Sequence, residues 1–342
     1  MTTAIYAATG DALAVIRRQN GRWDAELQLV GRPTQCVAAD PLRPEIVYCG
    51  TFGQGLWKSG DAGATWQPVG DGIPHGEVMS VAVSQLERSD GLGVVWAGTE
   101  PSALFRSDDG GQTWQERPTL KSLPSSPTWS FPPRPWTHHV RWIAPDPNLA
   151  ERIFVGIELG GVMRSLDDGL SWEDRKPGAQ PDSHTLRTPS LAPGYVYESA
   201  GGGFSESFDG GATWRHADEG LRWHYLWGLA VDPAEPRTLV VSASPSAREA
   251  HHGLQSAEST IYRRVAGGPW QEARQGLPEP RGTLAYVLAT CDAEPHVFYA
   301  APHQGDLYRS SDAGATWERL GAWPGGYQPK DVAGLVVVDL PG

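Results

Sequence analysis

Short runs of apolar residues, separated by turn residues, follow one another along the whole chain. Two such runs, 35–39 and 46–50, flank an Asp-Pro turn, and similar pairs of runs recur further along. Runs of this length, bounded by Asp, Pro and Gly, are typical of β-strands joined by tight turns. We therefore expect an all-β fold built from repeated antiparallel strand pairs. The three Asp-Pro turns are Asp40-Pro41, Asp146-Pro147 and Asp232-Pro233.

A second pattern, Ser-x-Asp-x-Gly-x-x-Trp, occurs five times, which excludes a chance turn. Its Asp carboxylate can accept backbone N–H bonds within a turn, its Gly suits a positive φ, and its Trp begins the next strand. Two weaker copies keep the tryptophan, at Trp23 and Trp270. The complete copies begin at Ser59, Ser107, Ser165, Ser207 and Ser310.

The spacing of this motif predicts the architecture. Successive tryptophans of the seven copies are 42 to 58 residues apart, the length of one four-stranded blade. The run 332–339 has no motif after it, and the run 4–9 has no inner strand before it. We therefore expect a single domain, 1–342, that forms a seven-bladed β-propeller of four-stranded blades. The C-terminal strand should join the first blade and close the ring, which removes an exposed sheet edge.

The repeated Ser-x-Asp-x-Gly-x-x-Trp motif is similar to the motif known as the Asp box. The chain therefore resembles the Asp-box family, also called the bacterial neuraminidase repeat family. The family includes sialidases, sortilin-type receptors and xyloglucan-cleaving propellers. The resemblance implies the propeller fold. It implies little about function, because the box of this family usually lies at the periphery of a blade, away from the active face.

The loop that enters each innermost strand should lie at the mouth of the central channel, where propellers usually bind ligands. Counting back eight residues from the Asp of each Asp-Pro turn places Arg32, His138 and His224 in these entry loops. The fifth blade lacks the Asp, and aligning it with the other blades places His184 at the equivalent position. Neutral imidazole is a ligand for zinc, copper or iron(II). We therefore predict that His138, His184 and His224 bind one divalent transition metal ion. The alternative is that these histidines only form structural hydrogen bonds.

Three residues further along the strands, the same count gives Arg141, Arg187 and Trp227. Guanidinium groups bind carboxylates and other anions through paired hydrogen bonds. We therefore predict that Arg141, Arg187 and Trp227, together with Arg32, bind the substrate.

His139 and Tyr225 each come one residue after a histidine of the entry loops, His138 and His224. Glu158 lies at the end of the second predicted strand of its blade. Histidine titrates near neutral pH, and His, Tyr and Glu side chains carry protons in many enzymes. We predict that His139, Tyr225 and Glu158 are the catalytic residues.

Two long segments, 117–135 and 243–259, flank the histidine-bearing blades. Loops of this length in a compact domain are usually functional or mobile. We expect both to act as lids, the second bringing His251, His252 and Glu258 to the site; the alternative is a neutral surface excursion.

Composition narrows the classes of partner. The formal net charge of -12 predicts no basic face, so we expect no nucleic-acid partner. No apolar run reaches about 18 residues, so we expect no membrane span. The start of the sequence lacks the features of a signal peptide and the three cysteines are sparse, which predicts a cytoplasmic protein with reduced thiols.

The resemblance to sialidases implies three arginines around a substrate carboxylate, the first of them in an Arg-Ile-Pro or Arg-Leu-Pro context. No arginine before Ser59 has this context, so true sialidase activity is not expected. Xyloglucan-type cleavage implies two facing aspartates, for which Asp182 and Asp331 are the candidates. A propeller lyase implies His and Tyr as proton carriers, with an Arg or a metal ion beside the substrate carboxylate.

We therefore expect an enzyme, a lyase or a glycoside hydrolase, with a His- and Arg-lined ligand site at the channel mouth. Its ligand should be a small polar molecule that is anionic or carbohydrate-like, and a metal ion is an open possibility. The alternative is a non-catalytic binding or assembly scaffold.

Overall fold

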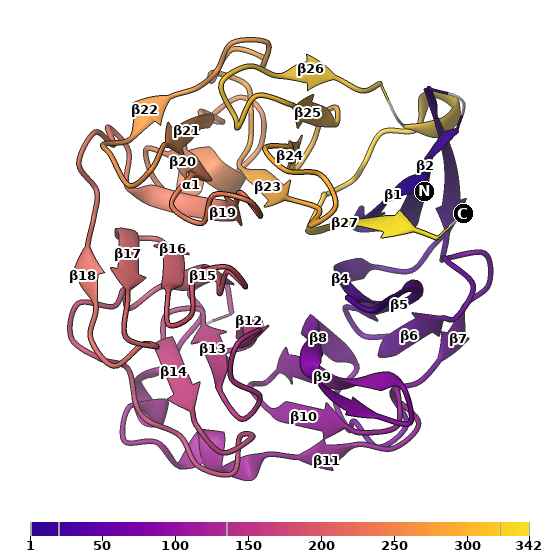
Figure 1. The fold of residues 1–342 in the computed structure, drawn as a ribbon, viewed down its shortest axis with the longest axis vertical. Coiled ribbons are helices and arrows are strands. Elements are labelled where there is room, and N and C mark those ends of the chain that lie inside the picture. Colours follow the sequence, from indigo (N-terminus) through magenta and orange to yellow (C-terminus); the bar gives the residue numbers. More distant parts are fainter. Residues whose placement is uncertain (1, 20, 135, 322, 342) are drawn as a thin grey trace.

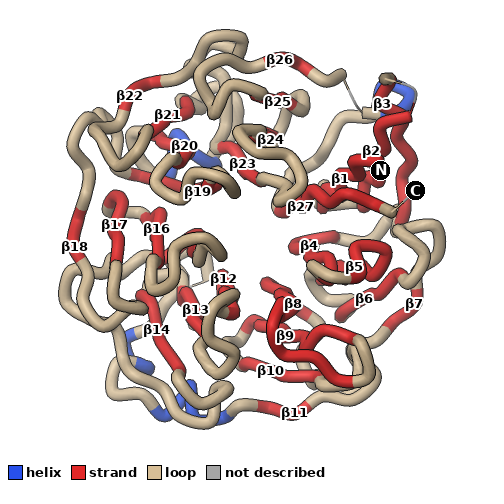
Figure 2. Tube along the Cα trace, viewed as in Figure 1, coloured by secondary structure: helices blue, strands red, loops and turns tan. Residues whose placement is uncertain are grey.

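The computed structural model describes residues 2–19, 21–134, 136–321 and 323–341. The strands of this part of the chain form seven sheets, arranged as blades around a common axis (Figure 1). Helical segments lie in the connections between strands, outside the sheets (Figure 2). None of the described helices is long and apolar enough to cross a membrane. The predicted seven-bladed β-propeller is confirmed.

In blades two to seven the strands follow chain order from the axis outwards, whereas blade one has the C-terminal strand innermost. Blade one contains β27 (Gly334–Leu340), β1 (Thr2–Ala8), β2 (Leu13–Gln19) and β3 (Arg22–Gln28). Blade two contains β4 (Thr34–Asp40), β5 (Arg43–Thr51), β6 (Leu56–Ser59) and β7 (Gln67–Pro68). Blade three contains β8 (Glu77–Ser89), β9 (Leu92–Glu100), β10 (Leu104–Ser107) and β11 (Gln115–Glu116). Blade four contains β12 (Val140–Pro145), β13 (Ile153–Ile157) and β14 (Gly161–Ser165).

The remaining three blades each have four strands. Blade five contains β15 (Ser183–Arg187), β16 (Val196–Ala200), β17 (Gly203–Ser207) and β18 (Arg215–His216). Blade six contains β19 (Tyr225–Val231), β20 (Leu239–Ser244), β21 (Thr260–Arg264) and β22 (Gln271–Glu272). Blade seven contains β23 (Tyr286–Ala289), β24 (Phe298–Pro302), β25 (Tyr308–Ser310) and β26 (Glu318–Arg319). The helical segments are η1 (Pro118–Ser122), η2 (Ser126–Thr128), α1 (Ala247–His251) and η3 (Pro324–Gly326).

Blade four departs from the predicted four strands. Its fourth position holds a single bridge, in which Glu173 pairs with Arg164 of β14. The backbone bonds between these two residues run in both directions, and their side chains form an ion pair of 2.6 Å. The outer edge of this blade is thus paired by one residue in place of a strand.

The C-terminal strand closes the ring as predicted. β27 pairs antiparallel with β1 in an unbroken register from Thr2 opposite Leu340 to Ala8 opposite Gly334. The two chain ends lie side by side in Figure 1. Because of this closure, β1 has a partner on its inner side and the two ends of the chain share one blade.

Each Asp box forms the same turn between the third and fourth strand positions of its blade, far from the axis. In the first box, the Ser59 hydroxyl donates to Asp61 Oδ1 (2.7 Å) and accepts from the Gly63 N–H (2.8 Å). The Asp61 carboxylate also accepts from the N–H and the hydroxyl of Thr65 (2.8 and 2.6 Å). These bonds lower the pKa of Asp61 to about 2. The same carboxylate contacts recur at Asp109, Asp167, Asp209 and Asp312.

Apolar side chains fill the spaces between neighbouring blades. Ile5 and Ile16 of blade one, for example, share a buried cluster with Tyr299 and Ala301 of blade seven. All four are fully buried. Apolar packing of this kind fills the spaces between blades all round the ring. The residues that face the central axis are therefore those of the innermost strands.

Candidate functional site

A cavity of about 730 Å³ lies where the chain enters the innermost strands. Its wall comes from the starts of β4, β8, β12 and β19, from the end of β13, and from the loop before β27. We call it the mouth cavity. Its titratable residues are His139, Arg141, Glu158, Asp182, Tyr225, His251, His252, His303 and Asp331, with Arg134 at one side.

β-bulges explain how the inner strands direct side chains towards the axis. In five innermost strands the antiparallel register shifts near the start, which leaves a residue outside the pairing. Such a residue is re-aimed relative to its neighbours. The residues left out include Gln35, Met79, Arg141, His184 and Trp227, and all of them except His184 line the mouth cavity.

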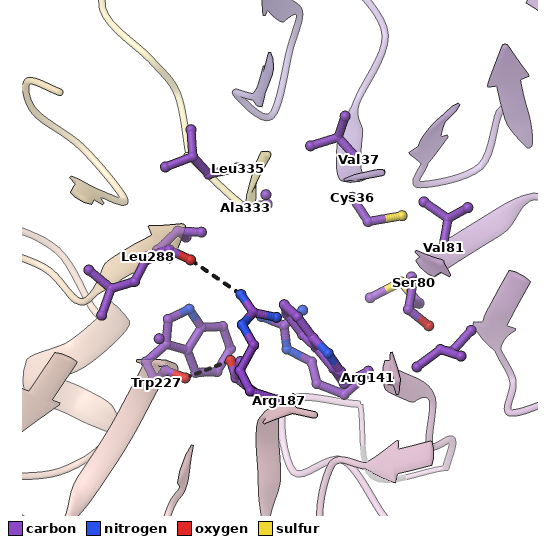
Figure 3. Close-up of a pocket in the computed structure, with 17 residues that line it drawn as sticks. Cys36, Val37, Ser80, Val81, Arg141, Arg187, Trp227, Leu288, Ala333 and Leu335 are labelled. Atoms are coloured by element: carbon purple, nitrogen blue, oxygen red, sulfur yellow. Dashed lines mark hydrogen bonds between the residues drawn. The ribbon is translucent and has the colours of Figure 1, made fainter. Parts of the chain in front are cut away.

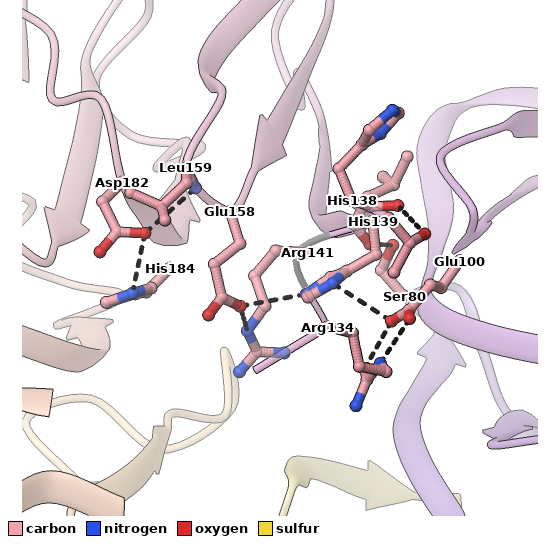
Figure 4. A network of polar contacts seen from close by, with 12 residues as sticks. Ser80, Glu100, Arg134, His138, His139, Arg141, Glu158, Leu159, Asp182 and His184 are labelled. Atoms are coloured by element: carbon pink, nitrogen blue, oxygen red, sulfur yellow. Dashed lines mark hydrogen bonds and ion pairs between the residues drawn. The ribbon is translucent and has the colours of Figure 1, made fainter. Parts of the chain in front are cut away.

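His139 is held between two carboxylates (Figure 4). Its Nε2 lies 3.0 Å from Glu158 Oε2, and its Nδ1 lies 3.4 Å from Glu100 Oε2. Glu100 also accepts two bonds of 2.6 Å from the Arg134 guanidinium. Burial opposes the charge on His139, but the bonds to both carboxylates outweigh it and raise the pKa of His139. For Glu100, burial is likewise outweighed by Arg134 and His139, which lower its pKa to about 2.

His184 is completely buried behind the mouth cavity. Its Nδ1 lies 2.6 Å from the Leu226 carbonyl oxygen, and its Nε2 lies 3.5 Å from Asp182 Oδ1. Its ring packs against Tyr225 and Trp227, with centroids 5.0 and 4.7 Å away. Burial opposes the charge on this ring, but Asp182 outweighs it and raises the pKa of His184.

A second group of aromatic and imidazole rings lies on the blade six and seven side of the cavity. Tyr225 Oη lies 3.1 Å from His251 Nε2. Burial, together with the charges of His303, His184 and Arg141, lowers the pKa of His251 to about 2. Burial also raises the pKa of Tyr225 well above its usual value. Tyr225 is therefore protonated and His251 neutral near pH 7.

His303 forms a close pair with Asp331. Its Nδ1 lies 2.6 Å from Asp331 Oδ1, and its Nε2 has no hydrogen-bond partner among the described residues. Burial opposes ionisation of Asp331, but His303 outweighs it and lowers the pKa of this carboxylate. The pair joins blade seven to the loop before β27.

Arg141 and Arg187 both line a smaller cavity (Figure 3), but only Arg141 also lines the mouth cavity. The Arg141 guanidinium lies 4.4 Å from the centre of the Trp227 ring, and its Nε lies 3.9 Å from Glu158. Arg187 lines the smaller cavity, of about 80 Å³ along the axis, which Trp227 also borders. It stacks on Trp142 at 4.6 Å, and burial lowers its pKa to about 10. Arg187 is absent from the lining of the mouth cavity.

The three histidines of the predicted metal site do not come together in the described part of the chain. His138 packs against Trp129, with ring centroids 5.4 Å apart, and His224 is exposed. Only His184 takes part in a group of potential ligand atoms, with Glu158 and Asp182. The count from the Asp-Pro turns fails for blade five, which lacks the Asp. In that blade the bulge falls at His184, so His184 corresponds to Arg141 and not to His138.

Arg32 also lies away from the mouth cavity. Its guanidinium stacks over Trp57 at 3.8 Å and donates to Gln54 Oε1 at 2.6 Å. Of the predicted substrate-binding residues, the structure thus brings Arg141 and Trp227 into the cavity and places Arg187 only in the smaller cavity and Arg32 outside. The three predicted catalytic residues, His139, Glu158 and Tyr225, all line it. Their catalytic role stays a prediction.

Both long segments reach the cavity. The first contributes Phe131, Pro132, Pro133 and Arg134, and Pro135 lies outside the described residues. The second forms α1 and contributes Ala247, His251 and His252, while Glu258 instead pairs with Arg281 at a backbone bridge. Whether they open and close stays a prediction.

Two residues of this region were not singled out from the sequence. Arg134 lies in a proline-rich segment that carries no strand pattern, and only its charge could have marked it. Glu198 is a fully buried carboxylate of β16 that accepts the Gln180 N–H at 2.9 Å. Burial raises its pKa to about 8, which the bond from Gln180 only partly offsets. A lone Glu within an apolar strand was the only signal for it.

Comparisons with known proteins agree with this architecture. Residues 105–116 match the BNR/Asp-box repeat. The chain therefore carries the repeat that its boxes predicted. No curated protein matches the chain significantly.

Several solved structures are similar in fold. An ancestral GH74 enzyme is 19% identical with a TM-score of 0.63, over 83% of this chain and 38% of its own. The GH74 xyloglucanase of Xanthomonas campestris is 17% identical with a TM-score of 0.61, over 84% of this chain and 45% of its own. This chain thus spans less than half the length of these two enzymes. YCF48 bound to D1 peptide is 20% identical with a TM-score of 0.57, over 84% of this chain and 82% of its own. At these identities the likeness shows the fold alone.

Proposed function

We propose that this protein is a lyase that binds a small acidic carbohydrate in the mouth cavity and removes a proton beside its carboxylate. The observation that carries the proposal is the His303–Asp331 pair. A bond of 2.6 Å from Nδ1 to the carboxylate fixes the ring and leaves Nε2, a buried atom in the wall of the cavity, without a hydrogen-bond partner in the described part of the chain. A histidine oriented by a carboxylate in this way is the usual arrangement of a general base.

The other groups of an elimination reaction border the same cavity. Arg141 carries a fixed positive charge and lies over Trp227 at 4.4 Å. In the proposal Arg141 binds the substrate carboxylate and Trp227 supports the sugar ring. Neutralising the carboxylate makes the neighbouring C–H bond more acidic. Tyr225 is protonated because of its raised pKa, so it is suited to donate a proton to the leaving oxygen.

The proposed step balances in atoms and electrons. His303 Nε2 takes the proton from the carbon next to the carboxylate, and the electron pair of that C–H bond forms a carbon–carbon double bond. The carbon–oxygen bond to the leaving sugar breaks, and its oxygen takes the proton of Tyr225. After the step, His303 releases its extra proton to solvent and Tyr225 takes a proton from solvent, which restores both groups.

Charge argues against a glycoside hydrolase at this site. Hydrolysis by a carboxylate pair needs one carboxyl group that is protonated, with a raised pKa. Burial opposes ionisation of Glu158, Asp182 and Asp331, but their histidine neighbours outweigh it and lower all three pKa values. The carboxyl groups whose pKa is raised, Glu87, Glu198 and Asp292, are all absent from the cavity lining.

An ultraviolet assay tests the proposal. The protein is mixed with oligomers of galacturonic, glucuronic and mannuronic acids, and the absorbance of the new double bond is followed. We expect one of these acidic oligomers to be cleaved with a rise in absorbance and a neutral xyloglucan oligomer to be left intact. Cleavage without a rise in absorbance would indicate hydrolysis. Binding without cleavage would favour the second candidate, a binding scaffold; YCF48, which is similar to this chain in fold, has been seen bound to D1 peptide.

A further inference from the structure

Three side chains from blades four and five meet at the edge of the mouth cavity. Glu158 follows β13, Asp182 precedes β15 and His184 lies within β15. One ligand atom from each lies within 4.8 Å of the other two. Figure 4 shows Asp182 and Glu158 on the side of the network where His184 lies. One imidazole nitrogen and two carboxylate oxygens form a donor set that suits a divalent transition metal ion.

The orientation of His184 supplies an independent observation. A carbonyl oxygen only accepts hydrogen bonds, so the contact of 2.6 Å with Leu226 means that Nδ1 carries a hydrogen. Nε2 then faces the carboxylates; its contact with Asp182 Oδ1, at 3.5 Å, is too long for a good hydrogen bond, and Nε2 has no other partner among the described residues, although the side chain is completely buried. Histidines that bind metal ions show this arrangement, with the second ring nitrogen donating to a carbonyl or carboxylate.

Asp182 is also held in place by its surroundings. Its Oδ1 accepts the Leu159 N–H at 3.1 Å. A Cβ atom added to Gly201 would lie 2.1 Å from its Oδ2, so only glycine leaves room for this carboxylate. The carboxylate therefore has a fixed position before any ion binds.

We propose that Glu158, Asp182 and His184 bind one divalent transition metal ion, such as Mn²⁺ or Zn²⁺, at the edge of the mouth cavity. Two ligand atoms about 2.1 Å from one ion lie at most about 4.2 Å apart. A small movement of the Glu158 carboxylate, whose Oε2 also contacts His139 Nε2, brings the set into range. Two carboxylates balance the charge of the ion. The positions left open face the cavity, because Glu158 and Asp182 line it, and take water or an anionic oxygen of a ligand.

Calorimetric titration of the full chain tests the site without any substrate, so its outcome is independent of the proposed reaction. After treatment with a chelator and its removal, Mn²⁺ and Zn²⁺ are titrated separately. We expect one ion per chain, and at least tenfold weaker binding by Asp182→Asn and Glu158→Gln. The matched controls are His138→Gln and His224→Gln, whose histidines lie outside the group, and both should bind like the unchanged chain.

Pulsed electron paramagnetic resonance of bound Mn²⁺ gives a second readout. Its first result, the number of coupled imidazoles, comes from the unchanged chain alone. The unchanged chain should show coupling to the nitrogen of one imidazole, and His184→Gln should lose that coupling while His138→Gln keeps it. Absence of saturable binding of one ion per chain would overturn the proposal. So would coupling to two or more imidazoles, or unchanged affinity in a folded Asp182→Asn variant.

Discussion

The Asp boxes and the mouth cavity lie at opposite ends of the blades and follow different rules. Every box repeats the same hydrogen bonds, in which one aspartate binds groups within four residues of itself. The mouth cavity contains no such repeat: His139, Asp182 and His303 come from different blades and each has a different carboxylate or histidine partner. Local bonds thus stabilise the periphery, whereas contacts between blades build the candidate site.

Substitutions in the two regions should therefore have different effects on stability, binding and activity. A box aspartate acts on its own turn, so its loss should lower stability and leave the cavity intact. A residue of the mouth cavity contacts other blades and, in the proposed function, the ligand, so its loss should change binding or activity more than folding.

Deletion of residues 334–342 should have the largest effect, because both regions depend on the closed ring. It removes β27 and leaves β1 without its inner partner along the whole register. We expect insoluble protein, or a chain that melts far below the unchanged one, as measured by circular dichroism. A truncated chain with normal melting would show that closure by β27 is dispensable.

Replacing Tyr225 by Phe should have the next largest effect, confined to the mouth. The variant keeps the ring that packs on His184 and loses only the hydroxyl near His251. Loss of a proton-transfer group lowers the rate by about 100-fold or more. The ultraviolet assay should show this fall in kcat with an unchanged melting temperature. Full activity in Tyr225→Phe would remove Tyr225 from the mechanism.

The stability of the folded chain should depend on pH through Glu198, the buried carboxyl group of β16. Burial raises its pKa from 4.5 to about 8, so the folded chain holds a proton that the unfolded chain releases between these values. This group therefore costs stability as the pH rises from 4.5 to 8, by about 1.4 kcal/mol for each pKa unit. Glu198→Gln should be more stable than the unchanged chain by a few kcal/mol at pH 8 and similar to it near pH 4.5. Denaturant unfolding at both values measures this difference, and equal stabilities at pH 8 would contradict it.

The smallest effect is expected from Asp167→Ala in the third box. The variant leaves the Ser171 N–H and hydroxyl without their acceptor. Because these groups are exposed and can bind water instead, the lost hydrogen bonds cost about 0.5–1.5 kcal/mol each. Urea unfolding should show this loss, and a conservative Asp167→Asn variant should recover part of it. Stability equal to that of the unchanged chain would mean that water replaces the carboxylate.

The sequence predicts the periphery much better than the mouth, for a physical reason. A box is a local turn, so Ser59, Asp61 and Gly63 determine its bonds without help from the rest of the chain. The mouth depends on where each inner strand forms its bulge, and a shift of register changes which side chain faces the axis. Arg141 and Trp227 were located correctly because blades four and six carry the Asp-Pro turn. His184 and Arg187 were misplaced in depth because blade five does not.

The partners across blades were beyond the reach of sequence analysis. Nothing in the spacing of His303 and Asp331 along the sequence shows that they lie 2.6 Å apart. Glu158 was predicted as a catalytic residue, whereas its position beside Asp182 and His184 depends on how blades four and five pack.

The central claim is that the mouth cavity, and not the boxes, binds the ligand. Calorimetric titration of a galacturonic acid trimer tests it most directly in three chains: unchanged, Asp167→Ala and Arg141→Gln. The proposal predicts equal dissociation constants for the unchanged chain and Asp167→Ala, and a constant at least tenfold higher for folded Arg141→Gln. Weakened binding in Asp167→Ala with full binding in Arg141→Gln would contradict the claim.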